Sequence, residues 1–427
     1  MAVKPKLALI PSGYKASKVY SVLPSDGVGD FDFSRSGQAT RVNEDGLIET
    51  VDSNVPRLNY PMIDGVVSGC PSLLLEPERR NLIQYSEDFS GYSSNNLDII
   101  SNQNISPSGV LNGTFLRPTT DNSAHQIYKN ASLTAGTNTL SVFIKAGNYS
   151  KFRLYFFDGT TAHEVKGNSS NGTIHSTNST VKVESYSNGW YRYSVTATNV
   201  TYSSGNYTIR VTDESYQDVW SGNGVDGLYI FGLQFENGSY ATSYIPNYGT
   251  ALGVTRSAET CNGAGDAATF NDSEGVLMAE ISSLANDSSL RTITLGDNSS
   301  SNAVSFRYDN PNQITLYLNS GGISQFSVAA NVQALSFNKC LIKYKANDFS
   351  AWINGFEVGT NTSGSTFTSG TLDRINFDIG YTSTDPFYGK TKQLQYFNIA
   401  LTDTDLEELT SWTSFNEMAQ AQLYTIQ

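Results

Sequence analysis

The stretch WYRYSVTAT at residues 190–198 decides the fold class of this chain. Its side chains alternate, so that Tyr193 and Val195 point to one side while Arg192 and Ser194 point to the other. A repeat of two residues is the geometry of a β-strand, whereas a helix would place apolar residues every three or four positions. The stretch therefore predicts a strand with one apolar side and one more polar side.

The same alternation recurs along most of the chain after residue 81. Turns rich in Gly, Asn and Ser separate the alternating stretches at the short spacing that is typical of β-sandwiches. A stretch rich in Gly, Ala and Asp, residues 261–273, interrupts the series. We therefore predict an all-β chain with two consecutive antiparallel β-sandwiches, over residues 81–260 and 261–427. The predicted strands are residues 139–146, 152–157, 180–185, 190–198, 206–212, 227–236, 276–282, 291–296, 303–308, 313–318, 340–345, 349–355, 376–380 and 392–400.

One short helix is predicted near the C-terminal end. Thr402 can cap it, and Asp405 follows three residues later, as in a capping box. Leu406, Leu409 and Trp412 then form an apolar stripe along one face.

Residues 1–80 differ from the rest because they hold seven of the 12 prolines. Proline disfavours helix interiors and central strands, since it lacks a backbone donor. Asp45-Gly46, between two alternating runs, is a strong hairpin signal. We expect an extended, loop-rich arm without a core of its own, which docks on another molecule or on the following domain.

The composition excludes several classes of function. The chain has 427 residues and a net charge of −13, and it has no basic stripe to neutralise phosphates, so we expect no nucleic-acid partner. The same charge disfavours an anionic membrane surface, and no apolar run approaches the about 20 residues that span a bilayer. The apolar run LALI near the start is too short for a signal peptide, so we expect synthesis in a cytoplasm without the usual export.

The sequence offers little catalytic chemistry. Three cysteines and three histidines form no zinc spacing, and no G-x-S-x-G motif is present. A glycosidase would need two carboxylates about 5–9 Å apart. The nearest acidic groups are Glu76 with Glu78 in the arm, and Asp403 with Asp405 at the predicted helix start, where acids favour the helix dipole. We therefore predict that the chain is not an enzyme, although carboxylates from different strands remain an alternative.

The C-terminal third contains two stretches with a family resemblance. NKCLIKYKANDFSAWINGFEVG (338–359) has a hairpin turn at Asn354-Gly355, and DIGYTSTDPFYGKTKQLQYFNIALTDTDLEEL (378–409) leads from strand to helix. Residues 268–412 thereby resemble concanavalin-like, laminin-G-like sandwiches. Members of this group sometimes bind a structural Ca²⁺, for which loop acids such as Asp213, Asp226 or Asp309 are candidates beside their simpler role as solvated loop residues.

Four earlier segments resemble a pattern of bacteriophage virion proteins, in which they frame a carbohydrate-binding-module-like jelly roll. The resemblance implies an appendage such as a tail fibre or head fibre, located in the virion. It further implies that residues 1–80 attach to other virion proteins, and that the chain forms a homo-oligomer, a trimer by the habit of such proteins. The segments are DFSRSGQATRVNEDGLIETV (32–51), VPRLNYP (55–61), CPSLLLEPERRNLIQYSEDF (70–89) and GLQFENGSYATSYIPNYGTALGVTRSAE (232–259).

Sugar binding is the chemistry that the composition suits best, because aromatic faces stack on sugar C–H groups and amides or carboxylates bind hydroxyls. Trp190, Trp352 and Trp412 are predicted to be packed. Trp220 lies in a loop-like segment and is the preferred exposed aromatic of the first sandwich. For the second sandwich the predicted contacts are Tyr381, Asp385 and Phe387.

The sequence thus predicts a virion structural protein that binds host-surface carbohydrate with its two sandwiches. No cofactor is expected beyond a structural calcium ion, and the metal site stays unknown. A purely structural protein that decorates a capsid or tail without any ligand is the first alternative. A polysaccharide depolymerase is the second.

Overall fold

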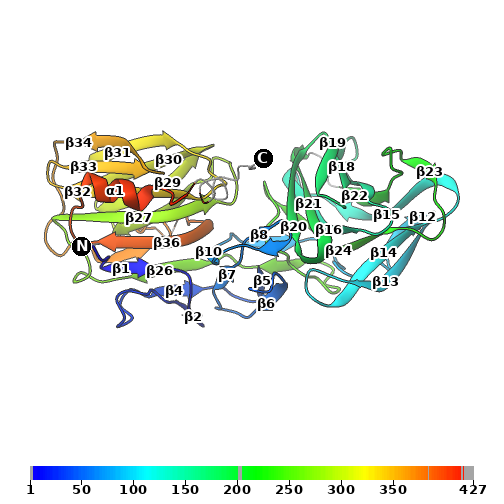
Figure 1. Cartoon of the computed structure of the whole chain (residues 1–427), viewed down its shortest axis with the longest axis horizontal. Coiled ribbons are helices and arrows are strands. Elements are labelled where there is room, and N and C mark those ends of the chain that lie inside the picture. The colour runs from blue at the N-terminus through cyan, green and yellow to red at the C-terminus, as the bar shows by residue number, and fades with distance from the viewer. Residues whose placement is uncertain (1–2, 201–203, 383, 415–416, 418–427) are drawn as a thin grey trace.

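The chain folds into two β-sandwiches that lie side by side (Figure 1). The computed structural model describes residues 3–200, 204–382, 384–414 and 417. Almost every predicted strand after residue 138 is present, so the prediction of an all-β chain with antiparallel sheets is confirmed. Within the described residues, no helix is long and apolar enough to cross a membrane.

The first sandwich is built from one continuous part of the chain, and its two sheets enclose a core that includes Leu140, Phe152 and Val195. The β16 sheet has the strand order β13 (Leu97–Ile105), β14 (Leu111–Pro118), β24 (Leu228–Asn237), β16 (Gly136–Ala146), β21 (Trp190–Val200) and β20 (Thr180–Tyr186). The β17 sheet has the order β12 (Ser93–Asn95), β15 (Asn122–Ser132), β22 (Ser204–Val211), β17 (Lys151–Phe157), β18 (Ala162–Asn168) and β19 (Thr173–Thr177), and β23 (Val219–Ser221) pairs with β15.

The second sandwich is discontinuous in sequence. The β27 sheet has the order β34 (Phe356–Asn361), β33 (Phe349–Ile353), β32 (Asn338–Lys345), β27 (Glu274–Ser283), β36 (Gly389–Phe397), β10 (Ser72–Leu74) and β7 (Arg57–Asn59), and β1 (Leu7–Leu9) also pairs with β36. The β29 sheet has the order β2 (Tyr14–Lys15), β3 (Lys18–Val19), β4 (Phe31–Ser34), β26 (Thr260–Ala264), β35 (Arg374–Asn376), β28 (Arg291–Gly296), β29 (Ala303–Asn310), β30 (Gln313–Ser320) and β31 (Ile323–Asn331).

The N-terminal residues therefore differ from the expected arm. Their strands add to both sheets of the second sandwich and skip the domain that follows them in sequence. Leu7, Leu9 and Phe31 are fully buried in its core. The prolines did interrupt the strands, but the short runs between them still carry enough apolar side chains to complete a sheet.

Short elements connect the two bodies. The predicted hairpin around Asp45-Gly46 is confirmed as β5 (Ala39–Val42) and β6 (Ile48–Val51), which pair in antiparallel register. Gly46 has a φ of 75°, the left-handed conformation that such a turn requires. The other short pairs are β8 (Met62–Ile63) with β9 (Val66–Val67) and β11 (Arg79–Asn81) with β25 (Val254–Arg256), and η1 (Ser187–Gly189) precedes β21.

The predicted C-terminal helix is present as α1 (Asp403–Thr410), on the outer face of the β27 sheet. Thr402 and Asp405 form the capping box, and Leu406 is fully buried. Trp412 was wrongly placed on the helical stripe, because the helix ends at Thr410. Its ring instead lies 4.5 Å from the ammonium nitrogen of Lys339.

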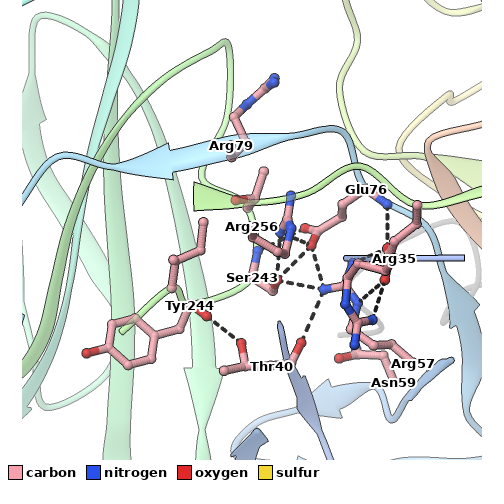
Figure 2. A network of polar contacts seen from close by, with 12 residues as sticks. Arg35, Thr40, Arg57, Asn59, Glu76, Arg79, Ser243, Tyr244 and Arg256 are labelled. Atoms are coloured by element: carbon pink, nitrogen blue, oxygen red, sulfur yellow. Dashed lines mark hydrogen bonds and ion pairs between the residues drawn. The ribbon is translucent and has the colours of Figure 1, made fainter. Parts of the chain in front are cut away.

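A buried network of ion pairs joins the N-terminal residues to residues 256–259, which follow the first sandwich (Figure 2). Arg35 Nη1 lies 2.8 Å from Glu259 Oε1, and Arg57 Nη1 lies 2.7 Å from Glu76 Oε2. Arg57 also pairs with Glu259, and Arg256 pairs with Glu76. Burial alone would raise the pKa of Glu76, but the charges of Arg256 and Arg57 outweigh it and lower that pKa. These five residues come from residues 32–51, 55–61, 70–89 and 232–259, so these four segments meet in one junction.

Candidate functional site

Trp220 is half-buried rather than freely exposed. It lies in β23, where its ring contacts the rings of His125 and Tyr149 at centroid distances of 4.9 and 5.0 Å. Its indole nitrogen donates to the Val211 carbonyl at 3.2 Å. These contacts give the ring a packing role, and its contact with a sugar stays a prediction.

The three residues predicted for the second sandwich do not form one exposed group. Tyr381 is 44% exposed, and the Asp385 carbonyl accepts a hydrogen bond from the Thr292 backbone at 3.0 Å. Phe387 is 1% exposed and packs in the core against Phe377. The assignment of Phe387 as a sugar contact is therefore wrong, because a stacking ring must present a free face.

The acids considered for calcium lie in separate loops and bind their own neighbours. Asp213 accepts from the Ser215 backbone at 2.9 Å, and Asp226 accepts from Asn148 and Asn223. The Asp309 carboxylate accepts from the Thr315 hydroxyl at 2.7 Å. Among the residues that the structure describes, no group of three or more His, Cys, Asp or Glu could hold a metal ion.

The two outer faces of the first sandwich differ in what covers them. The outer face of the β16 sheet packs at the junction, where Trp190 and Phe231 contact Ile48 of the β5–β6 hairpin and Tyr244. The outer face of the β17 sheet is the opposite face of the sandwich, and its Tyr128, Arg153 and Tyr155 side chains are partly exposed. A ligand can therefore reach these side chains.

Strand alternation places two distinctive side chains on that face. In β17, Phe152, Leu154 and Phe156 are fully buried, so Arg153 and Tyr155 point outward. The register extends this pattern across the sheet, because residues that pair between strands lie on the same face. One row consists of Gln126, Arg210, Arg153 and Lys166, and the next consists of Tyr128, Thr208, Tyr155 and Glu164.

Hydrogen bonds and ion pairs hold the first row in place. Asp218 Oδ2 lies 2.6 Å from Arg153 Nη1 and 2.7 Å from Arg210 Nη1. Arg153 Nε donates to Glu164 Oε2 at 2.7 Å, and Arg210 Nε donates to Gln126 Oε1 at 2.9 Å. Burial alone would lower the pKa of Arg153, but the bond to Glu164 and the charge of Asp218 outweigh it, so the pKa is raised.

Tyr155 stands beside both guanidinium groups. The central carbon of Arg153 lies 4.7 Å from its ring centroid, and that of Arg210 lies 5.9 Å away. Such contacts stabilise a ring in one orientation. The side chains of Arg153 and Arg210 are 19% and 13% exposed, so their edges still reach solvent. The face thus presents an oriented aromatic ring surrounded by fixed polar groups.

This arrangement is suited to binding rather than to cleavage. A ring with fixed hydrogen-bonding groups beside it can stack on sugar C–H groups and bind hydroxyls. Both carboxylates of the face, Glu164 and Asp218, are engaged by Arg153, so neither is free to act as a general acid. The β17 sheet face is therefore the candidate functional site, defined by Gln126, Tyr128, Arg153, Tyr155, Glu164, Arg210 and Asp218, whereas Thr208 in the same row is 2% exposed.

The sequence prediction missed this face, although a signal for it exists. The stretch FRLYFF at residues 152–157 was recognised as a strand, and its parity separates Arg153 and Tyr155 from the apolar positions. An outward arginine and tyrosine on one strand already suggest a binding face. The alternation within one strand cannot predict which residue of another strand lies beside Arg153, because Arg210 is 57 positions further along the chain.

Comparison with protein-family models gives a match within the second sandwich. Residues 277–407 match the family model of the Concanavalin A-like lectin/glucanases superfamily. This part of the chain is a concanavalin-like domain. The match leaves out the N-terminal strands that complete its sheets. No curated protein matches the chain significantly.

Several solved structures match parts of the chain at low similarity. The Ruminococcus gnavus IT-sialidase CBM40 bound to alpha2,3 sialyllactose is 14% identical, with 35% of this chain and 94% of that chain covered and a TM-score of 0.30. Domain 4 of AbnA, a GH43 extracellular arabinanase from Geobacillus stearothermophilus in complex with arabinotriose, is also 14% identical, with 41% and 84% covered and a TM-score of 0.30. Domains LG4-5 of the mouse laminin alpha1 chain are 9% identical, with 70% and 93% covered and a TM-score of 0.23. At these TM-scores the similarity does not bear on what this chain binds.

Proposed function

We propose that this chain is a carbohydrate-binding protein without hydrolytic activity, and that the β17 sheet face is its principal sugar contact. The observation that carries the proposal is Tyr155, which two guanidinium groups hold in place on the uncovered face of the first sandwich. The surrounding amide, hydroxyl and carboxylate groups supply partners for sugar hydroxyls.

The family match adds a second reason. The superfamily matched by residues 277–407 is named for lectins and glucanases, which both bind carbohydrate, so the match favours sugar binding over a purely scaffolding role and does not by itself separate binding from hydrolysis. Tyr381, which is 44% exposed, is the proposed contact of the second sandwich, with Asp385 beside it in the same loop. A single protein–sugar contact is weak, so two sandwiches on one chain would raise affinity by avidity.

We further propose that the chain serves in the virion of a bacteriophage, as a tail fibre, head fibre or similar appendage that binds host-surface glycans. Four segments that resemble virion proteins support this role, since they occur in order along the chain. Assembly as a homo-oligomer, a trimer by the habit of such proteins, would multiply the sugar contacts. The alternative is a structural decoration of the capsid or tail that binds no ligand.

Binding of the full chain to an array of glycans tests the proposal. Wild type should bind a subset of sugars, and Tyr155→Ala should lose at least tenfold in affinity, which corresponds to about 1.4 kcal/mol. The matched control is Tyr317→Ala, because Tyr317 also stands beside an arginine, Arg307 at 5.2 Å, but on the second sandwich. Loss in Tyr317→Ala with none in Tyr155→Ala would assign binding to the other sandwich.

Two further results would exclude the proposal in favour of its alternatives. Absence of binding by wild type, both on the array and to host cells, would leave the purely structural role. New reducing ends after incubation with a bound polysaccharide would show a depolymerase, contrary to the arrangement of Glu164 and Asp218.

A further inference from the structure

A cavity of about 80 Å³ lies at the junction of the two sandwiches. The first sandwich contributes Glu184 and Arg192, the second contributes Lys390, and the N-terminal residues contribute Arg41. Lys182 is 57% exposed by side chain and marks the side on which the cavity meets solvent. A ligand in this cavity would touch both sandwiches at once.

The charges around the cavity are not balanced. Four cationic side chains line it, against the two carboxylates of Glu76 and Glu184. Arg41 pairs with Glu49 at 2.6 Å, and Lys182 pairs with Glu184 at 2.8 Å. Glu76 is already engaged by the arginines of the junction network. Arg192 and Lys390 form no ion pair with a carboxylate among the described residues, although the charge of Glu184 acts on both and that of the buried Glu236 acts on Arg192.

Arg192 is 3% exposed and only partly satisfied. Its Nη1 donates to the Thr242 carbonyl at 2.7 Å and its Nη2 to the Ser141 hydroxyl at 3.0 Å. Its Nε is buried and has no hydrogen-bond partner among the described residues. An unpartnered guanidinium nitrogen is costly to bury, so a group that accepts from it is favoured.

Lys390 gives the second unbalanced charge. Within the described part of the chain, its ammonium forms neither a hydrogen bond nor an ion pair, whereas Lys392, two residues along β36, pairs with Glu280 at 3.4 Å. Burial and the charge of Lys182 lower the pKa of Lys390, while Glu184 opposes the change. The whole chain carries a net charge of −13, so this concentration of unpaired cations is local and unusual.

We propose that the junction cavity binds one small oxyanion, a carboxylate or a phosphate group, between Lys390 of the second sandwich and Arg192 of the first. The volume of about 80 Å³ has room for one such group, but not for a sugar chain. Bound there, the anion would link the two sandwiches through charge-assisted hydrogen bonds and restrict their relative motion. This site is separate from the β17 sheet face and does not depend on sugar binding there.

Calorimetric titration of the full chain tests the site. The probes are inorganic phosphate and acetate, with acetamide as the neutral probe and potassium chloride matching the ionic strength. Binding of phosphate alone assigns a phosphate site, binding of acetate alone assigns a carboxylate site, and binding of both supports the shared chemistry. Binding of neither, or equal binding of acetamide, overturns the proposal.

Two variants with opposite expected effects locate the anion. Lys390→Gln should lower the affinity about tenfold, and Lys392→Gln should not, although it removes the same charge from the same strand. Glu184→Gln should tighten binding several-fold, because it removes the acid that faces Lys182, Arg192 and Lys390. Unchanged affinity in Glu184→Gln would overturn the site even if Lys390→Gln failed to fold.

Discussion

The two sandwiches differ in how the chain supplies them. The strands of the first sandwich follow one another from β12 to β24, so each sheet is closed within one stretch of sequence. The second sandwich needs β1, β4, β7 and β10 from the N-terminal residues as well as strands from 260 onward. Segments that lack a core of their own can therefore be essential to a core elsewhere, and the first sandwich is an insertion between the two parts of the second.

Removal of the N-terminal strands should have the largest effect on the difference between the two sandwiches. A chain lacking residues 1–76 should keep a folded first sandwich and lose the second. Leu7, Leu9, Phe31, Phe33 and Leu73 are almost fully buried, and each contributes about 1.5–3 kcal/mol. Their combined loss is comparable to the whole stability of an ordinary domain, about 5–15 kcal/mol.

Scanning calorimetry and limited proteolysis measure this outcome. The truncated chain should lose the unfolding transition of the second sandwich, and residues after 260 should become sensitive to protease. A chain lacking only residues 1–5, which leaves β1 intact, is the control. Two undisturbed transitions in the longer truncation would show that the second sandwich does not need its N-terminal strands.

A smaller disturbance targets the ion network that joins the sandwiches. Arg57→Met leaves Glu259 and Glu76 with fewer cations in a buried site, which should cost about 3–5 kcal/mol of unfolding free energy. Arg80→Met is the control, because Arg80 is exposed in β11 and should change stability by less than about 0.5 kcal/mol. Urea denaturation gives both values, and equal effects would mean that the network contributes little.

The smallest expected effect is a difference in pH dependence between two buried glutamates. The pKa of Glu76 at the junction is lowered, so its stabilising contribution is complete above the unfolded value of about 4.3 and is lost as the pH falls below it. Burial raises the pKa of Glu236 in the first sandwich, so its contribution is present at low pH and is lost as the pH rises through the folded value.

Urea midpoints from about pH 3 to pH 6 compare the two groups. Glu76→Gln should reduce the loss of stability that occurs as the pH falls. Glu236→Gln should reduce the loss of stability that occurs as the pH rises. The same slope change in both variants would contradict the contrast between the junction and the first sandwich.

Much of the fold could be predicted because its signals are local. Alternation identified β16, β17 and β21, and the cap at Thr402 identified α1. The strands between residues 97 and 132 were missed, because polar residues interrupt their apolar pattern: β13 (Leu97–Ile105) has only Leu97 fully turned inward. Phe387 was misassigned because a loop-like sequence, DPFYG, concealed a ring that packs in the core.

The candidate site was harder to predict than the strands that carry it. Trp220 was chosen because its segment lacks alternation, but β23 pairs with β15 and brings the ring against His125. Tyr155 was overlooked because aromatic residues are abundant and only its neighbours distinguish it. Those neighbours come from β15, β18 and β22, and their register is not encoded in any one of these strands.

The sequence by itself determined that the chain is all-β, where its hairpins turn and where its helix begins, since each depends on side chains within a few residues. Only the tertiary structure decided that the first strands belong to the last domain and that Arg35 meets Glu259, 224 residues away. The physical reason is that burial and charge pairing act between whatever surfaces come together in space. The sequence pattern shows which side chains must be buried or paired, and the packed fold determines which residues they contact.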